Sequence, residues 1–285
     1  MRMSAAKKSM KKNLAGYLFV LPGLSGVLLF YLIPFGDMVR RSFCQAMGGF
    51  CGFENYKTVW NNEAFRLAAA NTVRFTLVCL PLLLLISLAV ALLLQGAGRL
   101  LEVFKSIYLV PMAIPAASMV LCWKLLFDAH GIVNGVLDRF FGISYDWMNT
   151  DKAFYVLVGS YIWKNLGYVV ILWLAAMAGV PTSIYEAARV DGAGWRQCFF
   201  SITLPCIRPA AFTIVVISFL NSFKAFREAY LVAGNYPQES IYLLQHLFNN
   251  WFLSLSVDKM AAGAVMLAII ISLIVQALMW LWERK

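Results

Sequence analysis

Charged residues are scarce in this sequence. They make up only 13% of the 285 residues, whereas a soluble domain usually contains about 25%. Hydrophobic residues account for 61% of the chain, and the mean hydropathy is +0.73. A soluble globule of this length needs a polar surface that this composition does not supply. We therefore expect the chain to be embedded in lipid.

Residue types that support catalysis or metal binding are also few. The two histidines, His130 and His246, are isolated in the sequence, and no Cys-x-x-Cys pair occurs, so a metal site is not expected. We predict that both histidines lie on the surface. The sequence shows no Ser/His/Asp set, and the phosphate loop G-x-x-x-x-G-K-[ST] is missing. These gaps argue against an enzyme and against an ATP site in this chain.

Cysteines are present but scattered. Cys79 and Cys122 sit in apolar runs and are expected to be small core residues. Cys44 and Cys51 are close enough in sequence to pair outside the cell, although we favour two free thiols.

What the sequence has in abundance is long apolar runs. Six of them can cross a hydrocarbon layer of about 30 Å, and each must be helical because lipid offers no partner to a bare backbone group. Internal prolines such as Pro81, Pro111 and Pro115 are expected to kink these helices. The fold class is therefore an all-α, polytopic membrane protein. The predicted spans are residues 15–36, 72–96, 107–127, 154–180, 209–232 and 260–282.

The basic residues predict the orientation of these spans. They gather near the N-terminus, at Lys7, Lys8, Lys11 and Lys12, and on the same side of later spans, whereas acidic residues prefer the other side. Both termini are therefore expected in the cytoplasm. The net charge of +10 follows from this flanking role and does not indicate a nucleic-acid partner.

The N-terminal lysines and the following apolar run resemble a signal peptide. The run extends from Ala15 to Pro34 and lacks an A-x-A-like cleavage site, so we expect a retained first span. Residues 1–14 are then a cytoplasmic tail, and residues 15–285 form a single transmembrane domain.

The segment between the fourth and fifth spans, residues 181–209, is too long for a simple hairpin. Ser183 and Glu186 have the spacing of a capping box, with Glu186 in the first helical turn. Gly192 is suited to end this helix in a left-handed conformation. A second short helix is expected from Trp195, ending at Leu204-Pro205 before the fifth span. Taken alone, this pattern also fits a surface hairpin that merely links two spans.

The same segment resembles the EAA loop of binding-protein-dependent ATP-binding-cassette importers. Glu186-Ala187-Ala188, Gly192 and Ile202-x-Leu204-Pro205 stand at that motif's spacing, and Asp191 precedes the glycine. Further stretches are similar to sugar permeases of the maltose type, although Gly234-Asn235-Tyr236-Pro237 departs from their usual Gly-Gly-Pro turn. These stretches are Tyr17–Pro34, Gly52–Tyr56 with Asn71-Thr72, Pro111–Asn134, and Ser222–Phe226 with Tyr230-Leu231.

The resemblance implies a machine with several partners. The EAA helices would dock on two separate ATPase subunits, which bind ATP and Mg, while this chain holds no cofactor. A second, similar permease subunit and an extracellular solute-binding protein would complete an importer of sugars or oligosaccharides in the bacterial cytoplasmic membrane. Glycerol phosphate or an amino acid is the alternative solute. An ion-driven secondary transporter is the alternative from another class.

Polar residues inside two predicted spans are candidates for the solute path, because polar groups in lipid are costly. Polar groups beside aromatic rings suit sugars, whose hydroxyls need hydrogen bonds and whose C–H faces pack on aromatic planes. The other reading is that they only link neighbouring helices. The candidates are Tyr161, Lys164, Asn165 and Tyr168 in the fourth span and Ser218, Asn221 and Ser222 in the fifth.

Overall fold

The computed structural model describes residues 18–45, 48–95 and 100–283. Within these ranges the chain forms helices and loops, and only an isolated bridge joins Cys44 and Phe50. The all-α prediction is confirmed. The helices are α2 (Ile33–Ser42), α3 (Glu54–Trp60), α4 (Glu63–Leu94), α5 (Leu100–Ala113), α6 (Ala116–Leu126), α7 (Ile132–Phe141), α8 (Ala153–Ala178), α9 (Thr182–Val190), α10 (Trp195–Cys198), α11 (Leu204–Ser222), α12 (Phe226–Ala233), α13 (Leu244–Leu253) and α14 (Val257–Glu283).

Among the described residues, five helices are long and apolar enough to cross a membrane. They cover Leu18–Ser42, Glu63–Leu94, Ala153–Ala178, Trp195–Leu231 and Val257–Glu283. A bent pair of helices raises the number to six, in agreement with the sequence. The predicted tail at residues 1–14 and the charges at both chain ends lie outside the described residues.

The third predicted span is broken rather than merely kinked. Its two halves, Ser106–Ala113 and Ala116–Leu126, meet at an angle of 95°. Pro115 stands at the break with an extended backbone and caps α6. A proline lacks the N–H needed to continue the helix and pushes the preceding residue out of helical geometry, so the chain turns sharply at this point. Pro81, by contrast, lies inside the continuous helix α4.

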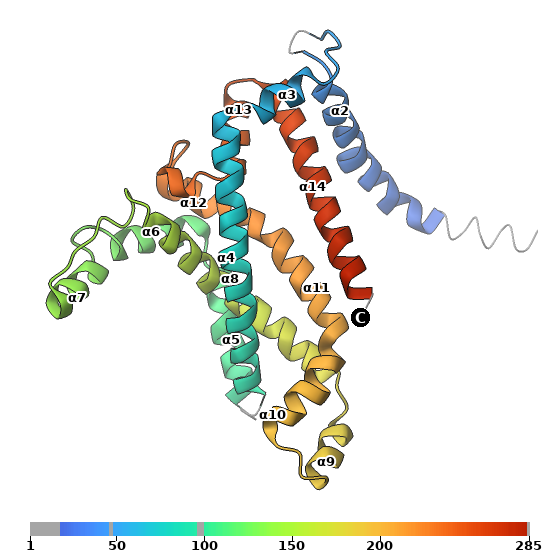
Figure 1. Ribbon diagram of the computed structural model, residues 1–285, viewed down its shortest axis with the longest axis vertical. Coiled ribbons are helices and arrows are strands. Elements are labelled where there is room, and N and C mark those ends of the chain that lie inside the picture. Colours follow the sequence, from blue (N-terminus) through green and yellow to red (C-terminus); the bar gives the residue numbers. More distant parts are fainter. Residues whose placement is uncertain (1–17, 46–47, 96–99, 284–285) are drawn as a thin grey trace, which may run out of the picture. The chain divides into compact units, whose positions relative to one another are not determined.

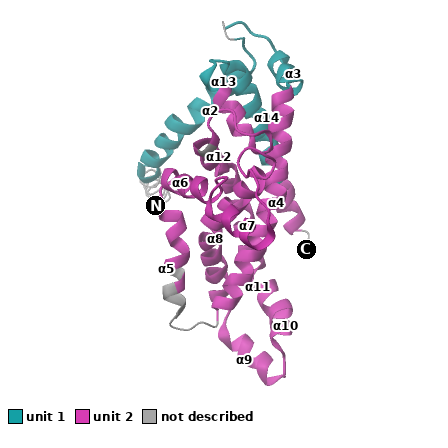
Figure 2. Ribbon diagram, turned by 90° about the vertical axis from the view of Figure 1, so that its left-hand side faces the viewer, with its two compact units in different colours: residues 1–62, 251–274 teal, residues 63–250, 275–285 magenta. Residues whose placement is uncertain are grey.

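The described chain divides into two compact units, coloured separately in Figure 2. The first contains residues up to 62 together with residues 251–274. In it, three aromatic rings, Phe43, Phe53 and Tyr56, pack with centroids 5.3–5.7 Å apart. The amide of Asn55 donates to the carbonyls of Ser42 and Cys44. Cys44 and Cys51 are both free thiols, as favoured from the sequence.

The second unit holds the main core, between α4 and α8 (Figure 1). Buried residues on α4 recur every three or four positions, which marks one helical face; they are Ala68, Thr72, Phe75, Cys79, Leu83, Ser87, Ala91 and Leu94. Across the seam, the indole of Trp173 donates to Ser87 Oγ at 3.0 Å. The ring of Tyr161 meets Phe75 edge to face, with centroids 5.5 Å apart.

Helix α5 packs on α8 at a glycine. A Cβ placed on Gly167 would lie 1.8 Å from the carbonyl oxygen of Tyr108, which no side chain tolerates. Gly167 therefore allows the backbones of α5 and α8 to approach closely.

Candidate coupling and transport site

Residues 181–209, called the coupling segment from here on, contain the short helices α9 and α10, a π-helical turn and the start of α11. α9 and α10 lie beyond the ends of α8 and α11, at the end of the second unit opposite α12 (Figures 1 and 2). The prediction of internal structure in this segment is confirmed.

The turn after α9 has the geometry that the sequence predicts. Gly192 adopts φ +81°, a left-handed conformation open to glycine. Its N–H donates to the carbonyl of Arg189 at 3.0 Å, and the N–H of Ala193 donates to the carbonyl of Ala188 at 2.9 Å. This pair of bonds is a Schellman motif, which satisfies the last carbonyls of the helix and fixes the direction of the exit.

The predicted capping box is wrong. The cap of α9 is Pro181, no side chain bonds to it, and the helix begins at Thr182. Ser183 is therefore already inside the helix, and Glu186 is in its second turn. Proline ends the preceding chain in an extended conformation and leaves no N–H for a carboxylate to accept from, so the reciprocal bonds do not form.

The predicted break at Leu204-Pro205 is also wrong. The helix that starts at Trp195 continues into the membrane span as far as Leu231. A π-helical turn, Phe199–Thr203, precedes Leu204, whose N–H donates to the carbonyl of Phe199. This wider turn changes the register just before Pro205, so the ring fits without ending the helix.

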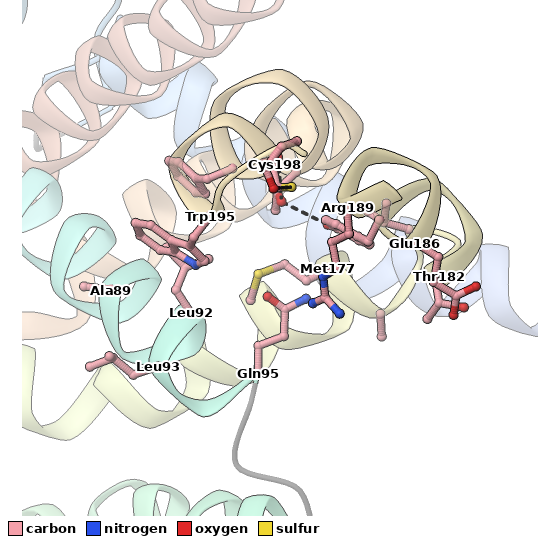
Figure 3. A pocket seen from close by; sticks show the side chains of 16 residues that line it. Ala89, Leu92, Leu93, Gln95, Met177, Thr182, Glu186, Arg189, Trp195 and Cys198 are labelled. Atoms are coloured by element: carbon pink, nitrogen blue, oxygen red, sulfur yellow. Dashed lines mark hydrogen bonds between the residues drawn. The ribbon is translucent and has the colours of Figure 1, made fainter. Parts of the chain in front are cut away.

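A hydrogen bond ties α9 to this π-helical turn. The hydroxyls of Tyr185 and Thr203 lie 2.9 Å apart, and both residues line a cavity of about 1000 Å³. Figure 3 shows this cavity between the end of α4, at Leu92 and Gln95, and the coupling segment, at Glu186 and Arg189. α9 is therefore bonded to the π-helical turn, and the cavity lies between the coupling segment and the end of α4.

Several apolar side chains of the coupling segment are exposed, and one of them, Trp195, lines the cavity. Val190 is 88% exposed, Trp195 68% and Phe200 64%. Exposed apolar side chains such as Val190 and Phe200 are typical of protein contact sites. Among the motif residues, Ala188 and Ile202 are half-buried, and the exposed ones are Ser183, Glu186, Ala187, Asp191, Gly192, Leu204 and Pro205.

The candidate path residues lie on α8 and α11, which pack against each other. Tyr161, Ser218 and Ser222 are buried; Lys164, Asn165, Tyr168 and Asn221 are half-buried. Several of them bond within the bundle. Asn165 donates to the carbonyl of Tyr161 at 2.8 Å, and Lys224 donates to Asn221 Oδ1 at 2.8 Å.

Two hydroxyls in this group have no partner among the described residues. Tyr161 Oη and Ser218 Oγ are both buried without a hydrogen bond. A buried polar atom without a partner is costly, which favours a bound molecule or water at this place.

Lys164 is neutralised inside the unit. Its ammonium group donates to the carboxylate of Glu228 on α12, and both side chains are largely buried.

His246 corrects a further expectation. Its side chain is completely buried, whereas His130 is exposed as predicted. His246 Nδ1 accepts from the N–H of Leu243, and its ring packs edge to face on Phe226 at 4.7 Å. Burial lowers the pKa of His246 to about 4, so the ring is neutral at physiological pH. A lone histidine between Gln245 and Leu247 gives no sign of this in the sequence.

Three polar residues form hydrogen bonds to other segments, which their positions in the sequence do not predict. Asn71 donates to the carbonyls of Glu239 and Tyr242, and the adjacent Thr72 accepts from the N–H of Leu244 at 3.0 Å. Asn134 accepts from the N–H of Tyr145 and from the indole of Trp147. Each connects segments that are distant in sequence.

This arrangement of spans and coupling segment matches a known family. Residues 75–284 match the family described as the inner membrane component of binding-protein-dependent transport systems. The chain belongs to this family. It is accordingly a multi-pass component of the inner membrane, and its role lies in transport.

Curated relatives of this permease chain cover most of its length. It is 30% identical over 230 residues to the trehalose/maltose transport system permease protein MalF of Thermococcus litoralis, with 78% of each chain covered. It is 27% identical over 282 residues to the sn-glycerol-3-phosphate transport system permease protein UgpA of Salmonella typhimurium, with 94% of each covered. It is 29% identical to the probable ABC transporter permease protein YesP of Bacillus subtilis, over 87% of this chain and 84% of the relative.

Solved structures support the same fold. The permease chain matches a chain of a bacterial ABC transporter involved in the import of the acidic polysaccharide alginate, with a TM-score of 0.86 and 22% identity. The match covers 98% of this chain and 99% of the other. At that identity the likeness concerns the fold and not the solute.

Proposed function

We propose that this chain is one of two homologous permease subunits of an ATP-driven importer that moves a sugar or oligosaccharide across the bacterial cytoplasmic membrane. Two separate ATPase subunits hold ATP and Mg and grip the coupling segment. A solute-binding protein delivers the solute from outside. The excess of basic residues near the N-terminus supports an orientation with both termini and the coupling segment in the cytoplasm.

The coupling segment carries this proposal. Its direction is fixed by the Gly192 turn, a hydrogen bond between Tyr185 and Thr203 joins α9 to the π-helical turn, and it exposes Val190 and Trp195. A segment that is internally tied can transmit a push from a docked subunit to α11, because no break separates α10 from that span. Coupling of this kind is a linkage between two remote sites through a two-state bundle.

Cross-linking tests the docking. A photoreactive amino acid placed at Val190 in the assembled complex is expected to capture an ATPase subunit, since this side chain projects from the coupling segment. The same amino acid at Tyr236, which is 80% exposed in the opposite part of the second unit, should not. If probes at Val190, Trp195 and Phe200 all fail to capture an ATPase, the docking role is wrong.

The polar residues of α8 and α11 support a sugar as the solute. Tyr161 Oη and Ser218 Oγ are unpartnered hydroxyls, and Tyr168 is half-buried nearby on α8. Hydroxyl groups beside aromatic rings match the donors, acceptors and C–H faces of a sugar ring. The relative that transports trehalose and maltose favours the same class.

Glycerol phosphate is the second candidate solute, favoured by the relatives whose alignment covers 94% of the chain. Competition for uptake in reconstituted vesicles separates the two. Trehalose or maltose should compete with the natural solute if a neutral sugar is carried, whereas glycerol 3-phosphate should compete if the solute is a phosphate ester. Uptake that persists without ATP and follows an ion gradient would overturn both and indicate a secondary transporter.

A further inference from the structure

Helix α7 presents an apolar stripe that no described residue of the second unit covers. Ile132, Val136 and Phe140 are 69%, 50% and 72% exposed. Residues four apart share one face of a helix, so these three side chains form one continuous stripe. We call Ile132, Val136 and Phe140 the α7 stripe.

The opposite face of α7 is pinned to the protein. Asn134 is buried, donates to the carbonyls of Asp128, Ala129 and Tyr145, and accepts from Trp147 Nε1. These bonds hold α7 in one rotation about its axis. The α7 stripe therefore faces outward because of the fold, and a small turn of the helix does not hide it.

The N-terminal end of α7 is tethered to α6, the second half of the broken span. α6 ends at Leu126, and α7 begins at Ile132, so the connecting chain can reach about 20 Å at most. α6 itself exposes Leu121 and Leu125, which are 62% and 74% exposed and lie four residues apart. Figure 1 shows α7 beside α6 at the periphery of the second unit, away from α4. The neighbouring helices α6 and α7 thus both expose apolar side chains.

The charges on α7 fit a boundary between lipid and water. Arg139 follows Ile132 by seven residues and lies at one edge of the stripe, where its long side chain can reach lipid phosphates while its stem stays near the apolar face. Asp138 lies on the other side of the helix, away from Phe140. Helices with one apolar face and one charged face typically lie in the plane of the interface, with the apolar side chains below the headgroups.

We propose that α7 is an interfacial helix whose stripe of Ile132, Val136 and Phe140 inserts among lipid chains, with Arg139 at the headgroups. The helix then braces the sharp bend of the broken span at Pro115 against the bilayer. The proposed topology puts this contact in the outer leaflet, but the contact with lipid does not depend on the solute or on the ATPase.

Fluorescence quenching tests this contact in the complete importer complex. The six native cysteines are replaced, and a single environment-sensitive dye is attached at Phe140→Cys or, as the matched control, at Asp138→Cys. Both complexes are placed in nanodiscs of phosphatidylethanolamine and phosphatidylglycerol that contain a lipid spin-labelled near the headgroup end of its acyl chain. We expect the dye at position 140 to be quenched at least about twofold more than the dye at position 138, with a blue-shifted emission.

Two results would overturn the proposal. Equal quenching of both dyes by aqueous iodide, with no effect of the spin-labelled lipid, would leave the stripe in water. Protection of position 140 only after the solute-binding protein is added would show that the stripe is a docking site for that protein instead. Val136→Cys provides a second reporter on the stripe if labelling at position 140 disturbs assembly.

Discussion

Lys164 on α8 and Glu228 on α12 form a buried ion pair, with side chains that are 17% and 8% exposed. Because Glu228 balances the charge of Lys164, the proposed solute path contains no unpaired ammonium group at this position. Removing one member of such a pair leaves the other charge buried without compensation.

We expect Glu228→Leu to lower the free energy of unfolding by about 3–5 kcal/mol, because it strands the Lys164 ammonium in a buried place. The double variant Lys164→Met with Glu228→Leu should recover most of this loss, since two apolar side chains then pack together. Thermal unfolding in detergent measures both. A double variant that is as unstable as the single one would show that the pair is needed for more than mutual neutralisation.

Gly167 should tolerate no side chain. Gly167→Ala places its Cβ against the carbonyl oxygen of Tyr108, so α5 must move away from α8 and the melting temperature should fall. Gly159→Ala on the same helix is the matched control, because nothing lies within 4 Å of its Cβ position, and alanine there should stabilise the helix by about 0.5–1 kcal/mol. Equal effects of the two substitutions would contradict the close packing of α5 on α8.

Gly192 is expected to set the angle of the coupling segment. Gly192→Val requires a β-branched residue at φ +81°, which is strained by more than about 1 kcal/mol. The variant should insert in the membrane and bind solute-binding protein normally, yet fail to link ATP hydrolysis to uptake. Gly194→Ala, where φ is −74°, is the control and should transport normally. Undiminished transport by Gly192→Val counts against the coupling role.

His246 predicts a loss of stability in acid. The folded-state pKa is about 4, below the value of about 6.5 for a free histidine. The unfolded chain therefore binds a proton as pH falls below 6.5 while the folded chain does not, so stability decreases between pH 6.5 and 4, by up to about 3 kcal/mol. Comparing the melting temperature of wild type and His246→Phe at pH 7.5 and pH 5 measures this; the variant should lose less.

The exposed His130 supplies the control for that measurement. Its side chain is 98% exposed, so His130→Phe should leave the difference between the two pH values unchanged. If His246→Phe keeps the full acid sensitivity of the wild type, the buried histidine is not its source.

Asn165 and Asn221 test the proposed solute path. Asn165→Leu and Asn221→Leu remove polar groups from half-buried positions on α8 and α11. If these side chains contact the solute, we expect each substitution to lower the solute affinity by about fivefold, since one hydrogen bond contributes about 1 kcal/mol. Thr213→Leu on the exposed part of α11 is the control. Unchanged solute affinity in both asparagine variants would remove these residues from the path.

The sequence by itself determined the helical class, the membrane environment and the place of the coupling segment. These depend on local properties: long apolar runs have one stable conformation in lipid, and Gly192 is suited to the left-handed turn wherever the helix ends. The sequence also favoured free thiols at Cys44 and Cys51, and the structure has them.

Only the tertiary structure decided the features that depend on contacts between distant segments. His246 is buried because α13 packs it against Phe226; Lys164 is neutral in effect because α12 brings Glu228 to it. Two predictions from local sequence patterns were also wrong because of the backbone geometry. Pro181, and not Ser183, is the N-cap of α9, and the π-helical turn lets the helix continue past Pro205. The physical reason is common to these cases. The packing of whole helices decides which partner a side chain meets and which register a helical turn adopts. Neighbouring residues in the sequence do not determine either.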